Sequence, residues 1–389
     1  MIYLKRKMLK NKTIVFLIHH QWDWSTDYQN QTAKILQQQK NLIIIYYSFK
    51  ESAWWKKSFW LSLIEKRDPN FIFFIPCYLL PLRRFKLIKK VNRQFNQWRF
   101  NQLVKRKQNQ RKLTCKDILY WFFLPDSLKL SQRLLNLKKR KIVFDCIDYF
   151  PNKRDLKKAI GQSAWIFSIG ENIKEYLEQH NPEKKQINLV PQGFDFENFK
   201  KIKTCRNTFP TDKPIIGYVG GINERLDYPL LIKLVKNNPQ WNFVFWGPWQ
   251  ASHLNKKIKK QLQKLEQLEN TIFGESDKKA VPAIIKQFDI GIIPYDVKKK
   301  YNLYCYPMKL FEYFYCGKPV ISTPIEELKN KKFTNSVKIA NSETEWAINI
   351  KDLLDVNWSE KNQNQQLELA LANSWNSKIE SIEKIIETT

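Results

Sequence analysis

The feature that most constrains the fold is a regular alternation of short apolar runs with helix-like segments along the chain. Two series of β-branched or aromatic runs predict strands: Thr13–Ile18, Leu42–Tyr47, Phe71–Ile75, Ile142–Phe144, Trp165–Ile169 and Ile187–Val190, then Ile215–Val219, Asn242–Trp246, Thr271–Phe273, Ile290–Ile293 and Val320–Ser322. Helical patterns lie between them, at Asp27–Gln39, Glu171–Gln179, Tyr228–Lys236, Leu254–Leu265, Lys279–Gln287 and Met308–Tyr315. Such alternation implies parallel sheets with helices on both faces. The fold class is therefore α/β, with two doubly wound domains.

The two series set the domain boundaries. We expect a first domain over residues 1–190, a linker over 191–214 and a second domain over 215–358. The tail over 359–389 is helical in pattern, and we expect it to pack toward the first domain. Ligands of open α/β sheets bind outside the carboxyl ends of the strands, so we place the chemistry in a cleft between the domains.

Cysteine spacing and hydropathy exclude several classes of protein. The six cysteines contain no C-x-x-C pair, which argues against a zinc ribbon or a disulfide scaffold and suits a reducing compartment. The longest apolar stretch, Phe71–Leu82, has twelve residues and two prolines, whereas a membrane span needs about 18. The basic residues Lys5–Lys7 precede only a short apolar run without a cleavage site. We expect a cytoplasmic protein.

The net charge of +30 is unevenly distributed, because +24 of it lies in the first 190 residues. Residues 69–116 contain no acidic side chain, and aromatic residues such as Phe95 and Trp98 lie among the basic ones. This composition suits an anionic membrane surface, where basic side chains and interfacial rings both contribute. A solvated helix in a lysine-rich chain is the main alternative, and nucleic acid is the least favoured partner.

The glycines locate any nucleotide site. No glycine precedes Gly161, and seven of the ten lie between Gly217 and Gly317. A backbone that approaches a phosphate closely needs residues without a Cβ. The first 160 residues therefore cannot contain a glycine-rich phosphate loop, and any nucleotide must bind in the second half.

The segment Gly217–Arg225 carries one candidate loop. A buried strand runs into the pair Gly220–Gly221, and a helix follows near Asp227, which we expect to be its N-cap. Backbone N–H groups and a helix dipole would then surround an anion, with Arg225 near enough to neutralise a diphosphate. The segment is not G-x-G-x-x-G, so a dinucleotide is not indicated, and a plain tight turn is an equally good interpretation.

The segment Tyr306–Thr323 carries the second motif. Pro307 suits the first turn of a helix and Gly317 suits its C′ position. Lys309 and Glu312 are three residues apart, so they share one helix face. A carboxylate can accept both ribose hydroxyls and an ammonium can pair with a phosphate. The alternative is an ordinary surface ion pair.

The stretch from Lys309 to Pro324 resembles the donor-site signature of GT-B glycosyltransferases of the group 1 (GT4-like) class, and in particular the branch of teichuronic-acid-type sugar transferases. Further segments follow in the family's order and approximate spacing: Ser163–Gly170, Leu189–Phe199, Gly217–Gly221, Trp241–Pro248, Phe288–Pro294 and Ala372–Trp375. The resemblance covers about residues 140–389, and the first 50 loosely. It implies two Rossmann-like domains facing a central cleft, with terminal helices crossing back to the first.

The resemblance assigns donor-site roles. Glu312 would hold the ribose, Lys309 and Arg225 the diphosphate, and Gly220–Gly221 the close backbone approach. The remaining expected donor-binding residues are Gly247, Gly274 and Leu310. The family has a second Glu eight residues before the ribose Glu, and this chain has Tyr304 there.

The aspartates of the sequence bear on two questions, namely whether a metal is bound and which residue activates the acceptor hydroxyl. The sequence contains no Asp-x-Asp pair, so we expect no metal and no cofactor, with cationic side chains and helix N-termini stabilising the leaving diphosphate. An inverting transfer needs a general base, for which Asp148 and Asp145 are the catalytic candidates. A helix N-cap is the alternative for Asp148. His19, His20 and Asp23 are acceptor-side candidates, and a structural role is the alternative for the histidines.

The sequence thus predicts a metal-independent, hexosyltransferase-like glycosyltransferase of cell-surface polysaccharide or glycolipid assembly. Its expected partners are a nucleoside-diphosphate sugar, a sugar or lipid-linked acceptor and an anionic membrane on whose inner face it would be peripheral. The alternative is a non-catalytic membrane-surface or nucleic-acid-binding protein with a transferase-like fold. The sugar, the nucleotide, the acceptor, the stereochemistry and the oligomeric state stay open.

Overall fold

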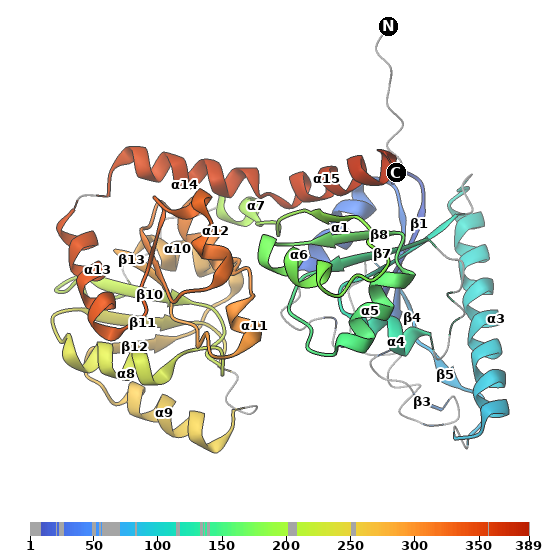
Figure 1. Ribbon diagram of the computed structural model, residues 1–389, viewed down its shortest axis with the longest axis horizontal. Coiled ribbons are helices and arrows are strands. Elements are labelled where there is room, and N and C mark those ends of the chain that lie inside the picture. The colour runs from blue at the N-terminus through green and yellow to red at the C-terminus, as the bar shows by residue number, and fades with distance from the viewer. Residues whose placement is uncertain are drawn as a thin grey trace, which may run out of the picture. The chain divides into compact units, whose positions relative to one another are not determined.

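The computed structural model describes residues 9–20, 22, 27–48, 52–53, 56, 71–81, 84–113, 117–132, 135, 137, 141–200, 208–249, 254–356 and 358–388 (Figure 1). The chain divides into two compact units. The first comprises Met1–Pro191 together with Lys378–Thr389, and the second comprises Gln192–Ser377. We refer to them as the first and second units.

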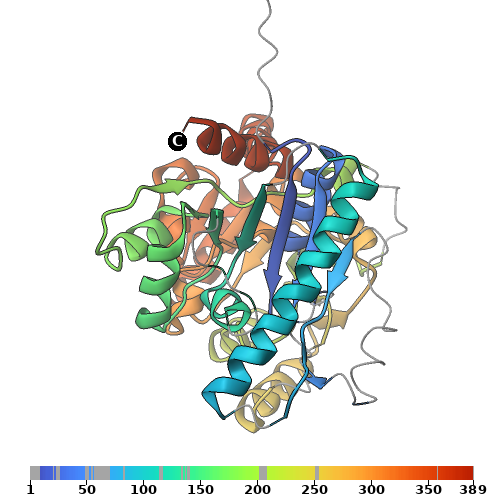
Figure 2. The same cartoon turned by 90° about the vertical axis from the view of Figure 1, so that its right-hand side faces the viewer.

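The first unit contains a parallel sheet with the strand order β4-β2-β1-β6-β7-β8-β9 (Figure 2). Its strands are β1 (Thr13–Ile18), β2 (Leu42–Tyr47), β4 (Ile72–Phe74), β6 (Ile118–Phe122), β7 (Lys141–Cys146), β8 (Trp165–Ser168) and β9 (Ile187–Leu189), and a separate pair is formed by β3 (Ser52–Ala53) and β5 (Cys77–Tyr78). Its helices are α1 (Asp27–Gln38), α3 (Lys86–Gln110), α4 (Pro125–Ser131), α5 (Lys153–Gln162) and α6 (Glu171–Glu178). Every residue of β1 and β2 is buried, as expected for parallel strands covered on both faces.

The long helix α3 packs on this sheet through a stripe of residues four apart: Asn92, Asn96, Phe100, Val104 and Gln108. The Phe100 ring contacts the rings of Tyr46 and Phe74. The asparagines bond to backbone instead. Asn96 accepts from the Cys77 N–H and donates to the Cys77 carbonyl, and Asn92 accepts from two N–H groups and donates to the Leu80 carbonyl. Polar side chains thus dock this helix, which explains why apolar periodicity does not reveal its buried face.

The second unit contains a parallel sheet with the strand order β12-β11-β10-β13-β14-β15. The strands are β10 (Ile215–Val219), β11 (Asn242–Trp246), β12 (Thr271–Gly274), β13 (Ile290–Ile293), β14 (Val320–Ser322) and β15 (Val337–Ile339). The helices are α7 (Phe196–Lys200), α8 (Tyr228–Asn237), α9 (Lys256–Glu266), η2 (Lys278–Ala280), α10 (Val281–Lys286), α11 (Lys300–Leu303), α12 (Lys309–Tyr315), η3 (Glu326–Lys329), η4 (Lys331–Phe333), α13 (Glu343–Asp355) and α14 (Glu360–Ala372). Helix α15 (Trp375–Thr388) begins in this unit, and from Lys378 it groups with the first.

Each sheet reverses its strand order once, and these reversals position the candidate sites. In the first unit β1 lies between β2 and β6, and in the second β10 lies between β11 and β13. The loops that follow the two central strands diverge at such a point and leave a crevice at the carboxyl edge, where ligands of doubly wound folds bind. Both units therefore have a topologically defined ligand edge.

Two of the three expected helix-end residues, Asp227 and Gly317, have the predicted roles, and Pro307 does not. The Asp227 carboxylate accepts a hydrogen bond from the Leu230 N–H and caps α8. Gly317 has φ +66° after α12, and its N–H donates to the Phe314 carbonyl while that of Lys318 donates to Tyr313. This double closure needs a left-handed residue, which glycine adopts at least cost. Pro307 lies outside the helix, because α12 begins at Lys309 with Met308 as its N-cap.

Several elements differ from the sequence-based expectation. Strands β6 and β15 and helices α5 and α13 were not predicted. The tail also divides differently: α14 packs against α12 in the second unit, and only the part from Lys378 groups with the first. Helix α14 stays in the second unit because its buried residues, Gln366 and Ala370, pack there. The Gln366 side chain donates hydrogen bonds to the carbonyls of Lys318 and Ser336. Among the described residues, no helix combines the length and apolarity that crossing a bilayer requires.

Candidate functional site

Three glycines line the carboxyl edge of the second sheet. Gly220 follows β10, Gly247 follows β11 and Gly274 ends β12. Backbone bonds join neighbouring strand ends, because the Gly220 N–H donates to the Trp246 carbonyl and the Gly247 N–H donates to the Gly274 carbonyl. Gly220 has φ +132° and Gly247 has φ +151°, and a Cβ on Gly247 would lie 2.2 Å from the Gly220 carbonyl oxygen. The edge is thus open backbone that no other residue type could provide.

Gly220 also makes room for Lys309. A Cβ added at Gly220 would lie 2.9 Å from Lys309 Nζ and 3.2 Å from the Tyr218 hydroxyl. The sequence predicted that this glycine and this lysine meet, and the geometry brings them together although 89 positions separate them in the chain. Because the Gly220 N–H is used within the strand edge, the glycine contributes space rather than a free donor.

The Lys309 ammonium is held by two tyrosines. Lys309 is 9% exposed, and its Nζ bonds to the Tyr218 hydroxyl at 3.0 Å and to the Tyr295 hydroxyl at 2.6 Å. The same Nζ lies 4.2 Å from the centre of the Tyr218 ring and 4.6 Å from that of Tyr295. Burial raises the pKa of the Tyr218 hydroxyl well above its usual value, so this phenol stays neutral.

No carboxylate of the described residues lies within 4.0 Å of Lys309 Nζ. Lys309 is therefore not half of a surface ion pair, which was the alternative interpretation of its spacing from Glu312. A buried cation is costly unless an opposite charge compensates it. Two phenol hydroxyls and two ring faces provide only part of that compensation, so the position is suited to an anionic ligand.

The Arg225 guanidinium also lies near Tyr295, one of the two tyrosines that hold Lys309. Its guanidinium carbon lies 5.9 Å from the centre of the Tyr295 ring and 5.3 Å from that of Tyr301. The backbone at Arg225 is fixed, because its carbonyl accepts from the Asp296 N–H and from the side chain of Asn302. Tyr295, two residues after the end of β13, thus contacts both cations of the candidate site. A diphosphate is the ligand that two neighbouring cations suit.

The remaining donor-site predictions fall on α12 and the loop before it. Glu312 is half-buried in the first turn of α12, one turn from Lys309 on the same helix. Leu310 is fully buried, and its N–H donates to the Pro307 carbonyl, so neither its side chain nor its N–H is presented to a ligand. Gly221 accepts from the Tyr218 hydroxyl through its carbonyl. Tyr304 lies between α11 and α12 and is half-buried.

The first unit has a polar cluster at its own ligand edge. His19 and His20 follow β1, and the His19 Nδ1 bonds to the Ser127 hydroxyl in α4 at 2.7 Å. The His20 Nε2 bonds to the Gln29 side chain at 2.8 Å, and the two imidazole rings meet edge to face. The buried Nδ1 of His20 has no hydrogen-bond partner among the described residues. A ligand with a hydroxyl could satisfy such an atom.

Both histidines are neutral at pH 7. Burial lowers the pKa of His19, against an opposing effect of Asp126, and burial together with the neighbouring His19 lowers the pKa of His20 to about 4. Because the pKa of His20 is lower in the folded protein than its unfolded value of 6.5, the unfolded chain binds more protons than the folded one between pH 4 and pH 6.5. This contribution to stability is therefore complete above pH 6.5 and declines as the pH falls toward 4.

We expect replacement of His20 by asparagine to flatten that pH dependence. Wild type should lose about 2 kcal/mol more free energy of unfolding than His20→Asn between pH 7 and pH 4.5, after allowance for the partial exposure of the ring. Urea unfolding at the two pH values measures this difference. If wild type and His20→Asn lose equal free energy of unfolding, His20 does not have the lowered pKa.

The catalytic candidates of the first unit differ in access. Asp145, in β7, is 0% exposed, and its Oδ1 pairs with Lys378 Nζ of α15 at 3.1 Å. It therefore lacks the access to substrate that a catalytic base needs. Asp148 follows β7 and is half-buried, and the N-cap of α5 is Asn152 rather than Asp148. Asp23 lies outside the described residues.

The tyrosines at both edges escaped the sequence analysis. Tyr218 lies within a buried strand and Tyr295 lies two residues after one, where aromatic side chains are ordinary core residues, so the sequence assigns neither a role. Tyr28 in α1 is half-buried near Asp145 of β7 and Asp148 after it, and burial, followed by Asp148 and Asp145, raises its pKa above the usual value. Only the position of Tyr295 just beyond the carboxyl end of a predicted strand, two residues after Ile293, could have indicated a site. Among the described residues, no three His, Cys, Asp or Glu side chains gather as a metal site requires.

The two parallel sheets and their covering helices define a class, the two-unit α/β proteins of the GT-B fold. Solved structures agree. A glycosyltransferase from Rickettsia africae ESF-5 superposes with a TM-score of 0.67 at 14% identity, covering 97% of each chain. Anabaena Alr3699/HepE, solved in complex with UDP, has a TM-score of 0.67 at 12% identity, covering 97% of this chain and 100% of that chain.

Comparison of the sequence with known proteins gives a family match and one relative. Residues 199–367, which lie in the second unit, match the family model of glycosyl transferases group 1. A stretch of 207 residues is 28% identical to TuaH of Bacillus subtilis (strain 168), which is named as a glycosyltransferase of teichuronic acid biosynthesis. The match covers 52% of this chain and 51% of TuaH, about half the length of that relative. The resemblance to the group 1 class and its teichuronic-acid-type branch is thereby confirmed.

Proposed function

We propose that the protein is a glycosyltransferase that moves a sugar, of hexose type, from a nucleoside diphosphate to an acceptor hydroxyl. The observation that carries this proposal is the buried ammonium of Lys309, held by Tyr218 and Tyr295 beside Gly220. A buried cation without a carboxylate, at the reversal point of a doubly wound sheet, suits a diphosphate. Similarity to a structure solved with UDP-glucose supports the same ligand class.

In the proposed reaction the second unit stabilises the leaving group. Negative charge grows on the diphosphate as the glycosidic bond breaks, and fixed cations placed there lower the barrier. Lys309 and Arg225 would supply those charges, and Glu312 would accept hydrogen bonds from the ribose. The three edge glycines would allow the nucleotide to approach the backbone. We propose no metal in this step, so a transfer rate that falls on addition of EDTA and recovers with a divalent cation would contradict this part.

The acceptor is proposed to meet the first unit. Asp148 is the candidate general base, since it is half-buried at the carboxyl edge whereas Asp145 is fully buried in an ion pair. The neutral imidazoles of His19 and His20 could orient a hydroxyl there. Similarity to TuaH supports an acceptor in cell-surface polysaccharide or glycolipid assembly, with the sugar or lipid carrier as its class.

Calorimetric titration with UDP tests the donor site. Glu312→Ala should weaken binding about tenfold, because two hydrogen bonds to a charged acceptor are lost. Glu368→Ala is the matched control, since Glu368 is an exposed glutamate of α14 in the same unit. Absence of UDP binding in wild type, and of other nucleoside diphosphates, would favour the non-catalytic alternative with a transferase-like fold.

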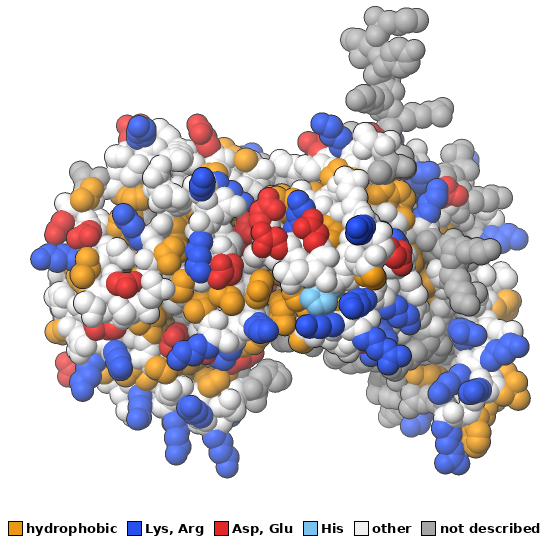
Figure 3. All heavy atoms as spheres, viewed as in Figure 1, with side chains coloured by type: hydrophobic (Ala, Val, Ile, Leu, Met, Phe, Trp, Pro, Cys, Tyr) orange, Lys and Arg blue, Asp and Glu red, His pale blue; other side chains and the backbone are white. Residues whose placement is uncertain are grey.

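We further propose that the exposed face of α3 binds anionic lipid from the cytoplasmic side. The helix contains no acidic residue, and its exposed basic residues are Lys86, Lys89, Lys90, Arg93, Lys105 and Arg106. Large apolar side chains lie among them, with Phe85 47%, Leu87 72% and Trp98 59% exposed. Figure 3 shows basic and hydrophobic side chains together at the lower right, where α3 begins. Cations beside exposed rings suit a headgroup layer.

Flotation with phosphatidylglycerol vesicles tests this surface. Exchanging Lys86, Lys89, Lys90 and Arg93 for glutamine should reduce binding by at least about 100-fold, since each cation contributes about 1 kcal/mol near an anionic membrane. The matched control removes Lys256, Lys257, Lys259 and Lys260, four exposed lysines of α9 in the second unit. Equal losses in both variants, or binding that persists on neutral vesicles, would contradict the proposal, and preference for nucleic acid over lipid would replace it.

A further inference from the structure

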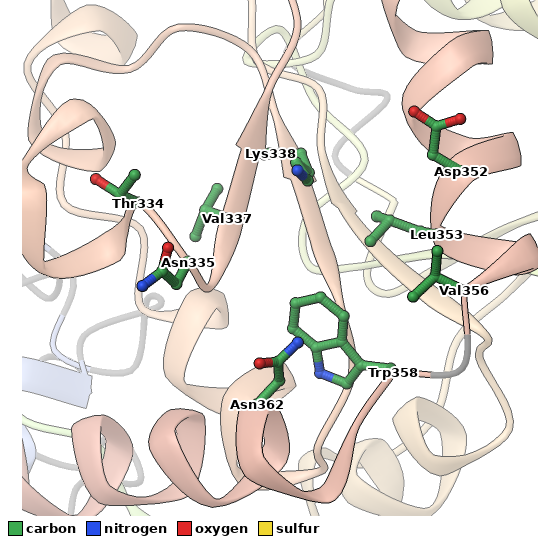
Figure 4. A pocket seen from close by; sticks show the side chains of 9 residues that line it. All are labelled: Thr334, Asn335, Val337, Lys338, Asp352, Leu353, Val356, Trp358 and Asn362. Carbon is green, nitrogen blue, oxygen red and sulfur yellow. The ribbon is translucent and has the colours of Figure 1, made fainter.

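A pocket of about 320 Å³ lies in the second unit, away from the glycine-lined edge (Figure 4). Its walls come from the start of β15, the end of α13 and the start of α14. Val337 opens β15 and pairs with Val320, which opens β14, so the pocket lies at the amino ends of the strands. Gly220 and Gly247 mark the carboxyl ends. The pocket is therefore topologically separate from the candidate donor site.

Trp358 is the central aromatic of this pocket, and its ring is held in place. The indole N–H donates to the Gln366 Oε1 at 3.1 Å, and the Trp358 carbonyl accepts from the Gln363 side chain at 3.0 Å. Gln366 is itself fully buried and donates to two backbone carbonyls. Because the indole N–H is satisfied inside the protein, the ring is an oriented platform rather than a donor for ligand. Little conformational entropy remains to be lost when a ligand stacks on it.

The rest of the lining combines three apolar side chains, Val337, Leu353 and Val356, with polar ones, and its charges sum to zero. Amide and hydroxyl groups come from Asn335, Thr334 and Asn362, and Figure 4 shows Asn362 beside the indole. The charged residues among the described lining are one cation, Lys338, and one carboxylate, Asp352. With one charge of each sign, the pocket has no net attraction for a phosphate, in contrast to the two cations of the donor edge.

We propose that this pocket is a second binding site, for one neutral pyranose unit of a saccharide. The electron-rich face of an indole suits the C–H groups on one face of a pyranose. Amides, a hydroxyl and a carboxylate suit its hydroxyls, which are both donors and acceptors. The volume is at the lower end of the roughly 300–1,000 Å³ of small-molecule pockets, enough for a single ring. This inference does not depend on the proposed transfer reaction.

Fluorine NMR of protein labelled with 5-fluorotryptophan tests the proposal. The chain has 14 tryptophans, and the Trp358→Phe variant identifies the resonance of Trp358. The probes are the methyl β-glycosides of glucose, galactose and N-acetylglucosamine. A methyl glycoside has only about 13 non-hydrogen atoms, and ligands of this size gain little binding free energy per atom, so we expect a Kd of roughly a few millimolar. We expect at least one glycoside to shift the Trp358 resonance saturably.

Variants and a control complete the design. Asp352→Asn and Asn335→Ala alter exposed side chains and should each weaken that Kd at least threefold, while UDP titration of the same samples stays as in wild type. Trp98, which is exposed on α3 in the first unit, is the internal control and should not shift. The proposal is overturned if no glycoside shifts Trp358 saturably, if Trp98 shifts equally, or if both variants bind as wild type does.

Discussion

Replacing Lys309 by methionine is expected to weaken UDP binding by at least about 30-fold, because removing a buried charge that pairs with a ligand costs about 2 kcal/mol or more. The fold should persist. Methionine retains most of the buried stem, and the Tyr218 hydroxyl keeps the Gly221 carbonyl as its acceptor. Calorimetry with UDP measures the loss, and circular dichroism checks that the variant is folded.

Lys329→Met is the matched control for this experiment. Lys329 is an exposed lysine of the same unit, paired with Glu326 on one helical turn, and its loss should leave UDP affinity unchanged. Surface pairs of this kind contribute at most about 1 kcal/mol to stability. If Lys309→Met binds UDP as tightly as the control does, the ammonium does not hold the diphosphate.

The second large effect is expected at the ion pair of Asp145 and Lys378. Both side chains are almost fully buried, at 0% and 1% exposure, and the second carboxylate oxygen of Asp145 has no hydrogen-bond partner among the described residues. Lys378→Met would leave an uncompensated buried carboxylate. We expect a loss of about 3–5 kcal/mol, which lowers the Tm by roughly 10 °C.

The double variant Asp145→Leu with Lys378→Met separates charge from packing. Because apolar replacement of both partners removes the desolvation cost together with the attraction, its Tm should recover most of the loss. Asp117→Ala is the control, since Asp117 pairs with Lys141 at the surface, where both side chains are about 60% exposed. If Lys378→Met is as stable as Asp117→Ala, the buried ion pair does not contribute to the stability of the fold.

Local sequence signals predicted several features near the glycine-lined edge of the second sheet. The strand over 215–219, the cap at Asp227 and the left-handed Gly317 follow from rules that act within a few residues, and all three are present. The meeting of Gly220 with Lys309 required family resemblance as well, because no local rule brings together residues 89 positions apart. Gly220 and Lys309 are thus the part of the candidate site that local sequence signals and family resemblance together could locate.

Other features depended on contacts that no local pattern encodes. Strand β6 follows a strongly basic segment, so its five residues were not recognised, although it forms the reversal point with β1. Tyr218 and Tyr295 have the appearance of core aromatics until the fold brings Lys309 to their hydroxyls. Asp145 is a catalytic candidate from its position at the carboxyl end of a predicted strand, and no local pattern reveals its partner Lys378, which lies 233 positions away.

The asparagines of α3 have a consequence for aggregation. A strand at the border of a sheet presents unpaired N–H and C=O groups that can recruit a strand from another molecule. On β5, the Cys77 N–H and carbonyl are both bonded to Asn96, while β3 pairs on the opposite side. Side-chain amides thus occupy positions that an intruding backbone would use, so this border resists templated self-association without a covering strand.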